Sequence, residues 1–268
     1  MNATDFYNHV LNKGICSSLI DTGTMDEEWE LIYCEFLERE KKKYREQFTW
    51  PIEVFRGIHF ASLYLPLRYM VWRTNHSANL VTEQCLQRIK IVSELFLWNC
   101  LLDDGKWSDS RRTDAEASLV RLCFGSGFTE LNSKEVSARQ RWREEYESLL
   151  RTLSCDYLSK DEWPQIVCMA IRYASWIIDL FQFRIIESRA DYTDDKDFLA
   201  HASAVVDGLR KYVPSDDALS MIRVWIQALK NPIDHSGAPI VGKSSELGAD
   251  RICVRKLSEI FIQRGSII

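Results

Sequence analysis

The first stretch of this sequence that could do chemistry is the acidic run from Asp103 to Asp109, whose sequence is Asp-Asp-Gly-Lys-Trp-Ser-Asp. It follows directly on an apolar segment with helical periodicity. Carboxylates at the C-terminus of a helix oppose the helix dipole by a few tenths to about 1 kcal/mol, so such a pair is either tolerated in solvent or kept for a cation. Because hard cations take several oxygen ligands, the run is a candidate metal site.

The segment from Leu95 to Asp104 resembles the helix end of class I terpenoid synthases, where an aspartate-rich motif binds magnesium diphosphate. That family carries a second metal motif on a facing helix, with its ligands four residues apart on one helix face. The nearest match here runs from Ile178 to Glu187, and Phe183 stands where the family has a hydroxyl. The third acid of the first motif comes late, the interval between the motifs is short, and no Arg-Tyr diphosphate sensor follows.

The resemblance implies an enzyme that uses Mg²⁺ and a prenyl diphosphate. Its metal ligands would be Asp103, Asp104, Asp179 and Glu187. The cations would neutralise the leaving diphosphate. Because the match covers only fragments of the chain, this enzyme is the alternative function.

A second motif, from Gly237 to Ser244, fits the phosphate-binding pattern G-x-x-x-x-G-K-[ST] letter for letter. In that pattern backbone N–H groups hold the phosphates, while Lys243 and Ser244 would serve phosphate and magnesium. The loop needs a strand before it and a parallel sheet around it. Here a helical pattern precedes it and little chain follows, so a plain Gly/Pro/Ser loop is the simpler interpretation and nucleotide binding a further alternative.

Arginines and tryptophans suggest a binding surface. Three arginines flank Trp142, and Arg and Trp are the residue types enriched at interface hot spots. The competing interpretation is a solvated helix face whose arginines pair with Glu144, Glu145 and Glu147. Trp107 and Trp163 lie at helix ends or among charges. The residues that we expect to bind a partner are Trp107, Arg139, Arg141, Trp142, Arg143, Tyr146 and Trp163.

Composition narrows the function classes. The net charge of −5 argues against a protein that mainly covers phosphate backbones, so RNA binding through the arginines near Trp142 is the weakest alternative. The eight cysteines are scattered without a C-x-x-C pair, which is poor support for a zinc site. The N-terminus shows no secretory signal, and no window approaches the roughly 18 apolar residues of a membrane span, so we expect a cytoplasmic or nuclear protein.

The elements that position these residues are helices almost throughout, because the apolar periodicity is helical and no convincing strands occur. Thr24 and Glu27 predict a capping box, Pro66 predicts a kink or split, and Gly105 predicts a left-handed helix end. Helices are expected over residues 24–48, 52–72, 82–102, 113–124, 132–153, 161–188, 195–212, 215–230 and 249–263.

The pattern predicts one all-α domain over residues 1–268, a globular bundle of about eight or nine helices. The segments 52–74 and 164–188 are apolar on most sides and should be its two central buried helices. Gly125-Ser126-Gly127 would form a hinge, and residues 231–248 a long loop.

The expected function is a helical protein–protein interaction module, an adaptor or scaffold subunit of a larger complex that binds a partner helix or peptide in an inter-helical groove. No catalytic set is complete in a fitting context, which favours a role other than catalysis. Nine Trp and ten Tyr are more than a core of this size needs, and surplus amphipathic aromatics are typical of grooves and interfaces.

Overall fold

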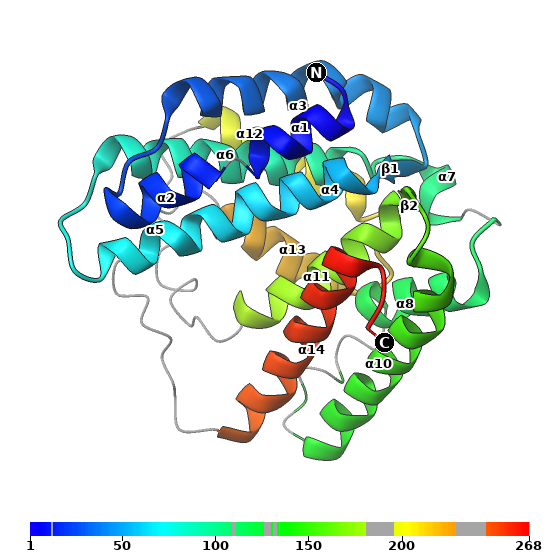
Figure 1. The fold of residues 1–268 in the computed structure, drawn as a ribbon. Coiled ribbons are helices and arrows are strands. Elements are labelled where there is room, and N and C mark those ends of the chain that lie inside the picture. The colour runs from blue at the N-terminus through cyan, green and yellow to red at the C-terminus, as the bar shows by residue number, and fades with distance from the viewer. Residues whose placement is uncertain are drawn as a thin grey trace.

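In the computed structural model the helical periodicity of the sequence becomes an all-α bundle, which confirms the predicted fold class (Figure 1). The structure describes residues 1–11, 13–108, 111–125, 130, 133, 135–180, 196–228 and 245–267. No helix within these residues is long and apolar enough to cross a membrane.

The helices are α1 (Ala3–Val10), α2 (Lys13–Asp21), α3 (Glu27–Glu46), α4 (Ile52–His59), α5 (Leu65–Arg73), α6 (Leu80–Asn99), α7 (Asp104–Trp107), α8 (Asp114–Phe124), α10 (Val136–Tyr157), α11 (Gln165–Leu180), α12 (Lys196–Leu209), α13 (Asp216–Ala228) and α14 (Ser245–Arg264). A π-helical turn, η1 (Phe60–Tyr64), joins α4 to α5. The strands are β1 (Thr49–Pro51) and β2 (Glu162–Pro164).

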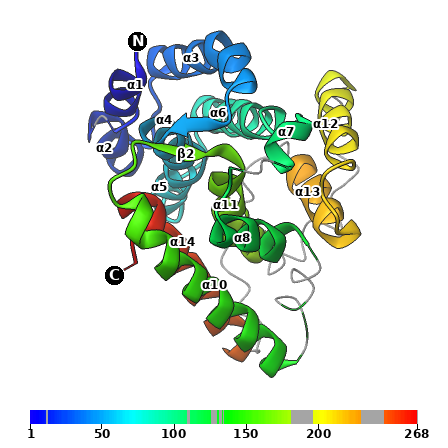
Figure 2. The same ribbon diagram turned by 90° about the vertical axis from the view of Figure 1, so that its right-hand side faces the viewer.

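The helices form layers around α11. Figure 1 shows α3 above α6, and α10 beside α14, with α11 between these groups. Figure 2 shows α12 and α13 on the side of the bundle away from α1 and α2. Every residue of α11 from Gln165 to Ser175 is buried, as the pattern predicted for a central helix.

The second predicted central helix, residues 52–74, is interrupted at Pro66 as expected. α4 ends at His59, the π-helical turn η1 follows, and Pro66 lies in the first turn of α5. Proline has no N–H for the carbonyl oxygen of Ser62, four residues earlier, and its ring clashes with that carbonyl group. A wider π turn just before the proline accommodates both effects.

The helix start predicted at Thr24 is corrected by two residues. The N-cap of α3 is Asp26, whose Oδ1 accepts hydrogen bonds from the backbone N–H groups of Glu28 and Trp29, at 2.9 and 3.3 Å. The hydroxyl of Thr24 instead forms a hydrogen bond with the hydroxyl of Thr22. The negative charge of an aspartate at the N-cap also interacts favourably with the positive end of the helix dipole.

Two short strands correct the expectation that no strands occur. β1 and β2 pair antiparallel, with Trp50 opposite Trp163, and both indole rings are fully buried. Each tryptophan is followed by a proline that leads into a buried helix, α4 or α11. Residues 161–164 were expected to form the first turn of the longest helix. They instead form strand β2 and the residue that precedes it.

Three further helix ends differ from the prediction. Gly105 lies inside α7 and is not in the left-handed region, which among the described residues holds Gly23 and Gly265. α10 begins at Val136, while the start predicted at residue 132 lies outside the described residues. α14 begins at Ser245, within the predicted loop 231–248. Of the predicted hinge, Gly125 ends α8, and residues 126 and 127 lie outside the described residues.

Lys106 holds three helix ends together beneath α7. Its buried ammonium donates to the carbonyl oxygens of Tyr44 and Arg45 at the end of α3, at 3.4 and 2.7 Å. It also donates to the carbonyl oxygen of Cys100 after α6, and to Oε1 of Gln165, the first residue of α11, at 2.9 Å. Because helix C-termini carry partial negative charge, a buried cation stabilises this junction.

Candidate functional site

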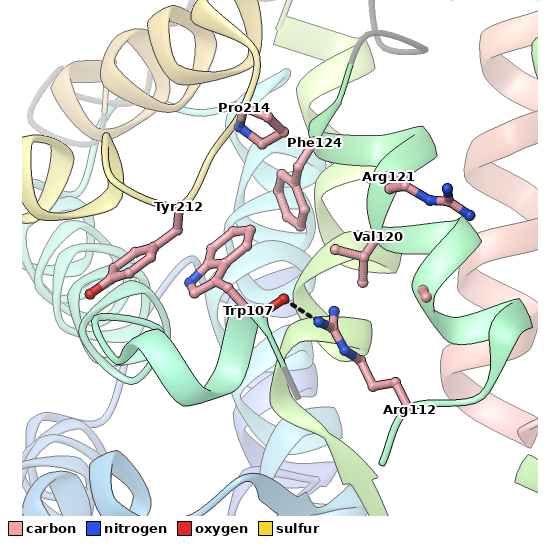
Figure 3. A pocket seen from close by; sticks show the side chains of 8 residues that line it. Trp107, Arg112, Val120, Arg121, Phe124, Tyr212 and Pro214 are labelled. Atoms are coloured by element: carbon pink, nitrogen blue, oxygen red, sulfur yellow. Dashed lines mark hydrogen bonds between the residues drawn. The ribbon is translucent and has the colours of Figure 1, made fainter. Parts of the chain in front are cut away.

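An open pocket lies where α7, α8 and the α12–α13 connection meet (Figure 3). Its volume is about 260 Å³. Side chains of eight residues line it: Trp107, Arg112, Ala117, Val120, Arg121, Phe124, Tyr212 and Pro214. We call it the Trp107 pocket.

Three aromatic rings form the walls of the pocket. Trp107 stacks on Tyr212 with ring centroids 5.9 Å apart and meets Phe124 edge to face at 5.4 Å. The indole N–H of Trp107 donates to the carbonyl oxygen of Leu101 at 2.7 Å, which fixes the ring. Because the rings are held before anything binds, a ligand would pay little entropy to order them.

A capping box places the α8 side of the pocket. The hydroxyl of Thr113 accepts from the backbone N–H of Glu116 at 3.2 Å, and the Glu116 carboxylate accepts from the N–H of Thr113 at 2.8 Å. The same carboxylate accepts a hydrogen bond from Tyr157 of α10. The capping box fixes the residue at which α8 begins. Residues at helical spacing between Ala117 and Phe124 therefore lie on one face of the helix.

Two arginines give the pocket its charge. Arg112 donates a hydrogen bond to the carbonyl oxygen of Trp107 and so lies against one wall (Figure 3). Arg121 is exposed, extends outward from α8 and bonds Oγ of Ser118 at 3.1 Å. An aromatic cleft beside two guanidinium groups suits a ligand that is apolar at its centre and anionic at its edge.

Trp107 is the one predicted partner-binding residue that lines this pocket. The sequence pattern did not predict the other residues that line the pocket. Trp107 and Tyr212, for example, are more than a hundred residues apart, and no spacing rule relates positions so distant. Arg112 precedes α8 and Arg121 lies within it; the pattern predicted this helix but does not show which way the two arginines face.

Four other residues that were expected to bind a partner lie in the core. Arg139, Trp142, Tyr146 and Trp163 are all buried in the core, at 1% exposure or less. Trp142 stacks on Tyr146 at 5.1 Å, and the Tyr146 hydroxyl bonds that of Ser258 on α14. The side chains of Arg139, Trp142 and Tyr146 therefore belong to the inner face of α10, and that of Trp163 belongs to the buried strand β2.

The remaining arginines of α10 have different surroundings. Nη1 of Arg143 donates to Asp250 of α14 at 2.7 Å, and Nε of Arg139 lies 3.7 Å from the same carboxylate. Neither of these contacts is the pairing with neighbouring glutamates that the sequence suggested. Arg141 is exposed. Partner binding at Arg141 and Arg143 stays a prediction.

Of the residues proposed for magnesium, Asp103 and Asp104 lie at the opposite end of α11 from Asp179. Asp103 is exposed and accepts from the N–H of Gly105 at 2.8 Å, and Asp104 begins α7. α7 contacts the first residue of α11 through Lys106, whereas Asp179 lies in the last turn of α11. At about 1.5 Å per residue, the two ends of α11 are about 21 Å apart.

Two other candidates for ligand binding cannot be placed. Glu187 and the phosphate-loop motif 237–244 lie outside the described residues. The described elements on either side of that motif are the helices α13 and α14. Within the described chain, no three His, Cys, Asp or Glu side chains gather as a metal site would require.

A buried charged centre, made of His59, Glu94, Arg172 and Glu259, lies between α4, α6, α11 and α14. Nη1 of Arg172 donates to Nδ1 of His59 at 2.9 Å, and Nη2 donates to Glu94 and to Oγ of Ser62. Nε2 of His59 lies 3.0 and 3.1 Å from the two Glu259 oxygens. The signal in the sequence for this centre was Arg172, one of two arginines in the mostly apolar segment 164–188.

His59 is committed to this network on both ring nitrogens. Since Nδ1 accepts from Arg172, the proton of the neutral ring lies on Nε2 and is donated to Glu259. Burial holds the pKa of His59 below its ordinary value, which keeps the ring neutral at neutral pH. With neither nitrogen available, His59 positions Arg172 and Glu259 and is not suited to act as a general base.

The ionisation of Glu259 should make the free energy of unfolding vary with pH in the acidic range. Burial by itself would raise its pKa, but His59 and hydrogen bonds from His59, Tyr64 and Ser175 lower the pKa from 4.5 to about 2. Ionised Glu259 therefore stabilises the fold above pH 4.5, and this stabilisation of about 3 kcal/mol is lost as the pH falls toward 2. Chemical denaturation at a series of pH values measures it.

Glu259→Gln is the matched variant for this titration. We expect the variant to be less stable than the natural chain at neutral pH and the difference to disappear near pH 2. A stability difference that stays constant over the whole range would show that Glu259 does not carry the effect.

The chain was also compared with known proteins, and no family model, no curated protein and no solved structure matches it.

Proposed function

We propose that this chain is a protein-interaction module that binds a segment of a partner protein at the Trp107 pocket, as an adaptor or scaffold subunit does. The observation that carries the proposal is a pre-ordered aromatic cleft with two arginines in its lining, Arg112 against one wall and Arg121 directed outward from α8 (Figure 3). Tryptophan and arginine at a pocket are the usual composition of an interface hot spot.

The size of the pocket favours a protein side chain over a free metabolite. Its volume of about 260 Å³ is below the range of roughly 300–1,000 Å³ in which drug-sized ligands bind. It suits one large apolar side chain that anchors a longer segment. Since Arg112 and Arg121 flank the cleft, the segment should carry carboxylates next to that anchor.

A random peptide library displayed on phage, selected on the purified full chain, tests this proposal. We expect the selected peptides to share an apolar anchor with nearby Asp or Glu. The charge reversal Arg121→Glu should weaken binding of a selected peptide by about tenfold or more, because it replaces attraction by repulsion at the pocket edge. Fluorescence anisotropy with a labelled peptide measures the affinity.

Two further variants separate the pocket from the rest of the surface. Ala117→Leu fills part of the pocket without removing a contact and should also weaken binding. Arg151→Glu makes the same charge change at an exposed position on α10 that is not among the residues expected to bind a partner, and should leave affinity within about twofold. Peptides without acidic residues, or peptides that bind the Arg121→Glu variant as well as the natural chain, would refute the proposal.

A further inference from the structure

One face of α6 carries three polar side chains that point to a second site, independent of the Trp107 pocket. Gln87, Lys90 and Glu94 follow one another at intervals of three and four residues, which places them on the same side of the helix. The side of α6 toward α3 carries other residues, Arg88 bound to Glu30 and Ser93 bound to Tyr33. The three polar groups are therefore not part of the α3–α6 packing.

Two of these side chains hold buried atoms without hydrogen-bond partners. Glu94 is 1% exposed, and although one of its oxygens accepts from Arg172, Oε2 has no partner in the described chain. The amide nitrogen and oxygen of Gln87 are both buried and without partners there. Folded proteins pair nearly all such atoms, so three orphaned atoms on one helix face indicate a ligand that completes them.

Lys90 lies between these two residues and supplies the reactive group. Its side chain is partly exposed, and burial lowers the pKa of its amine while Glu94, one helical turn away, opposes that shift. A lysine in such surroundings has more of its neutral amine at physiological pH than a lysine in water. The neutral amine is the form that attacks carbonyl carbons.

We propose that Lys90, Glu94 and Gln87 form a binding site for a small carbonyl compound, which Lys90 holds as an imine. Gln87 offers one donor and one acceptor to polar groups of the ligand. Oε2 of Glu94 is the acceptor through which protons pass during the reaction.

The reaction is balanced without another reagent. The lone pair of Nζ attacks the carbonyl carbon, a C–N bond forms, and the carbonyl oxygen gains a proton that the nitrogen releases through Glu94. The carbinolamine then loses this oxygen as water: the nitrogen releases its remaining proton to Glu94, which passes it to the leaving hydroxyl, the C–O bond breaks, and the nitrogen lone pair forms the C=N bond. One amine and one carbonyl give one imine and one water.

Reductive trapping of the full chain tests the proposal. The chain is incubated near neutral pH with propionaldehyde and cyanoborohydride, whose hydride converts the imine to a stable secondary amine, and peptide mapping gives the rate at each lysine. We expect Lys90 to be alkylated about tenfold or more faster than the exposed Lys42 and Lys256. A rate at Lys90 equal to or below theirs would overturn the proposal.

Gln87→Met distinguishes a ligand site from a lysine that is merely reactive. The substitution removes two unpaired buried polar atoms, so the variant should fold and melt at a higher temperature than the natural chain. If Gln87 binds the carbonyl compound, trapping at Lys90 at low probe concentration should nevertheless become about fivefold slower or more, while Lys42 is unaffected. Unchanged trapping at Lys90 in this variant would rule out the site.

Discussion

Replacing Arg172 by methionine is expected to lower the free energy of unfolding by about 3–5 kcal/mol. The guanidinium is completely buried and donates to His59, Ser62 and Glu94. Without it, the Glu94 carboxylate would stay buried without its hydrogen-bonded guanidinium partner, which is the costly part of breaking a buried ion pair. Guanidinium chloride unfolding at neutral pH measures the change.

The double variant Arg172→Met, Glu94→Met shows whether charge is the cause. Because it removes both charges and keeps the volume apolar, we expect it to regain most of the lost stability. Arg151→Met is the control, since Arg151 and Glu147 form an exposed pair one turn apart on α10, at 2.7 Å, and should cost no more than about 0.5 kcal/mol. A double variant as unstable as Arg172→Met alone would contradict this explanation.

The second large effect is expected at Lys106, where Lys106→Met should lower the free energy of unfolding by about 3 kcal/mol. The ammonium is 2% exposed and donates to oxygens from the ends of α3, α6 and α11. Methionine fills similar space but donates nothing, so carbonyl groups at two helix ends lose a charged partner. Thermal and chemical unfolding measure the loss.

Lys42→Met is the matched control for Lys106→Met, because Lys42 is exposed on α3 close to the same helix end. It should change stability by less than about 0.5 kcal/mol. Equal effects of the two substitutions would mean that the buried position of Lys106 contributes nothing beyond the loss of one positive charge.

The run from Asp103 to Asp109 shows what sequence reasoning could and could not find. The pattern placed the end of α6 at Leu102, three residues beyond its end at Asn99, and directed attention to the two aspartates. The residue that organises this region is Lys106, whose contacts come from α3 and α11, far away in the chain. Periodicity predicts where helices begin and end, but it does not predict which helix ends meet.

The misplacement of the α10 residues has a different cause. Trp142, Tyr146, Leu150 and Leu153 follow one another at helical spacing, and Arg139 falls on the same stripe. That spacing indicates that these residues share a face directed toward the core. For Arg139, the charged residues beside it in the sequence favoured the opposite interpretation, an exposed position. A buried arginine is rare unless it is paired, and here its partner Asp250 comes from another helix.

The Trp-Pro ladder could not be predicted from alternation, because strands of three residues are too short to show it. The repeated dipeptide, Trp50-Pro51 and Trp163-Pro164, was the available signal. Its meaning depends on pairing between distant segments, which a single sequence does not reveal.

The ladder also constrains the order in which the chain can fold. Thr49 and Glu162, which bond across the strands at 2.7 Å, are 113 residues apart. Closing a loop of that length costs about 4 kcal/mol of chain entropy beyond a constant, before any contact compensates it. During synthesis, Trp50 therefore has no strand to pair with until β2 leaves the ribosome, so we expect the N-terminal helices to reach their final packing late. A chaperone that covers apolar surfaces would find its target in that interval.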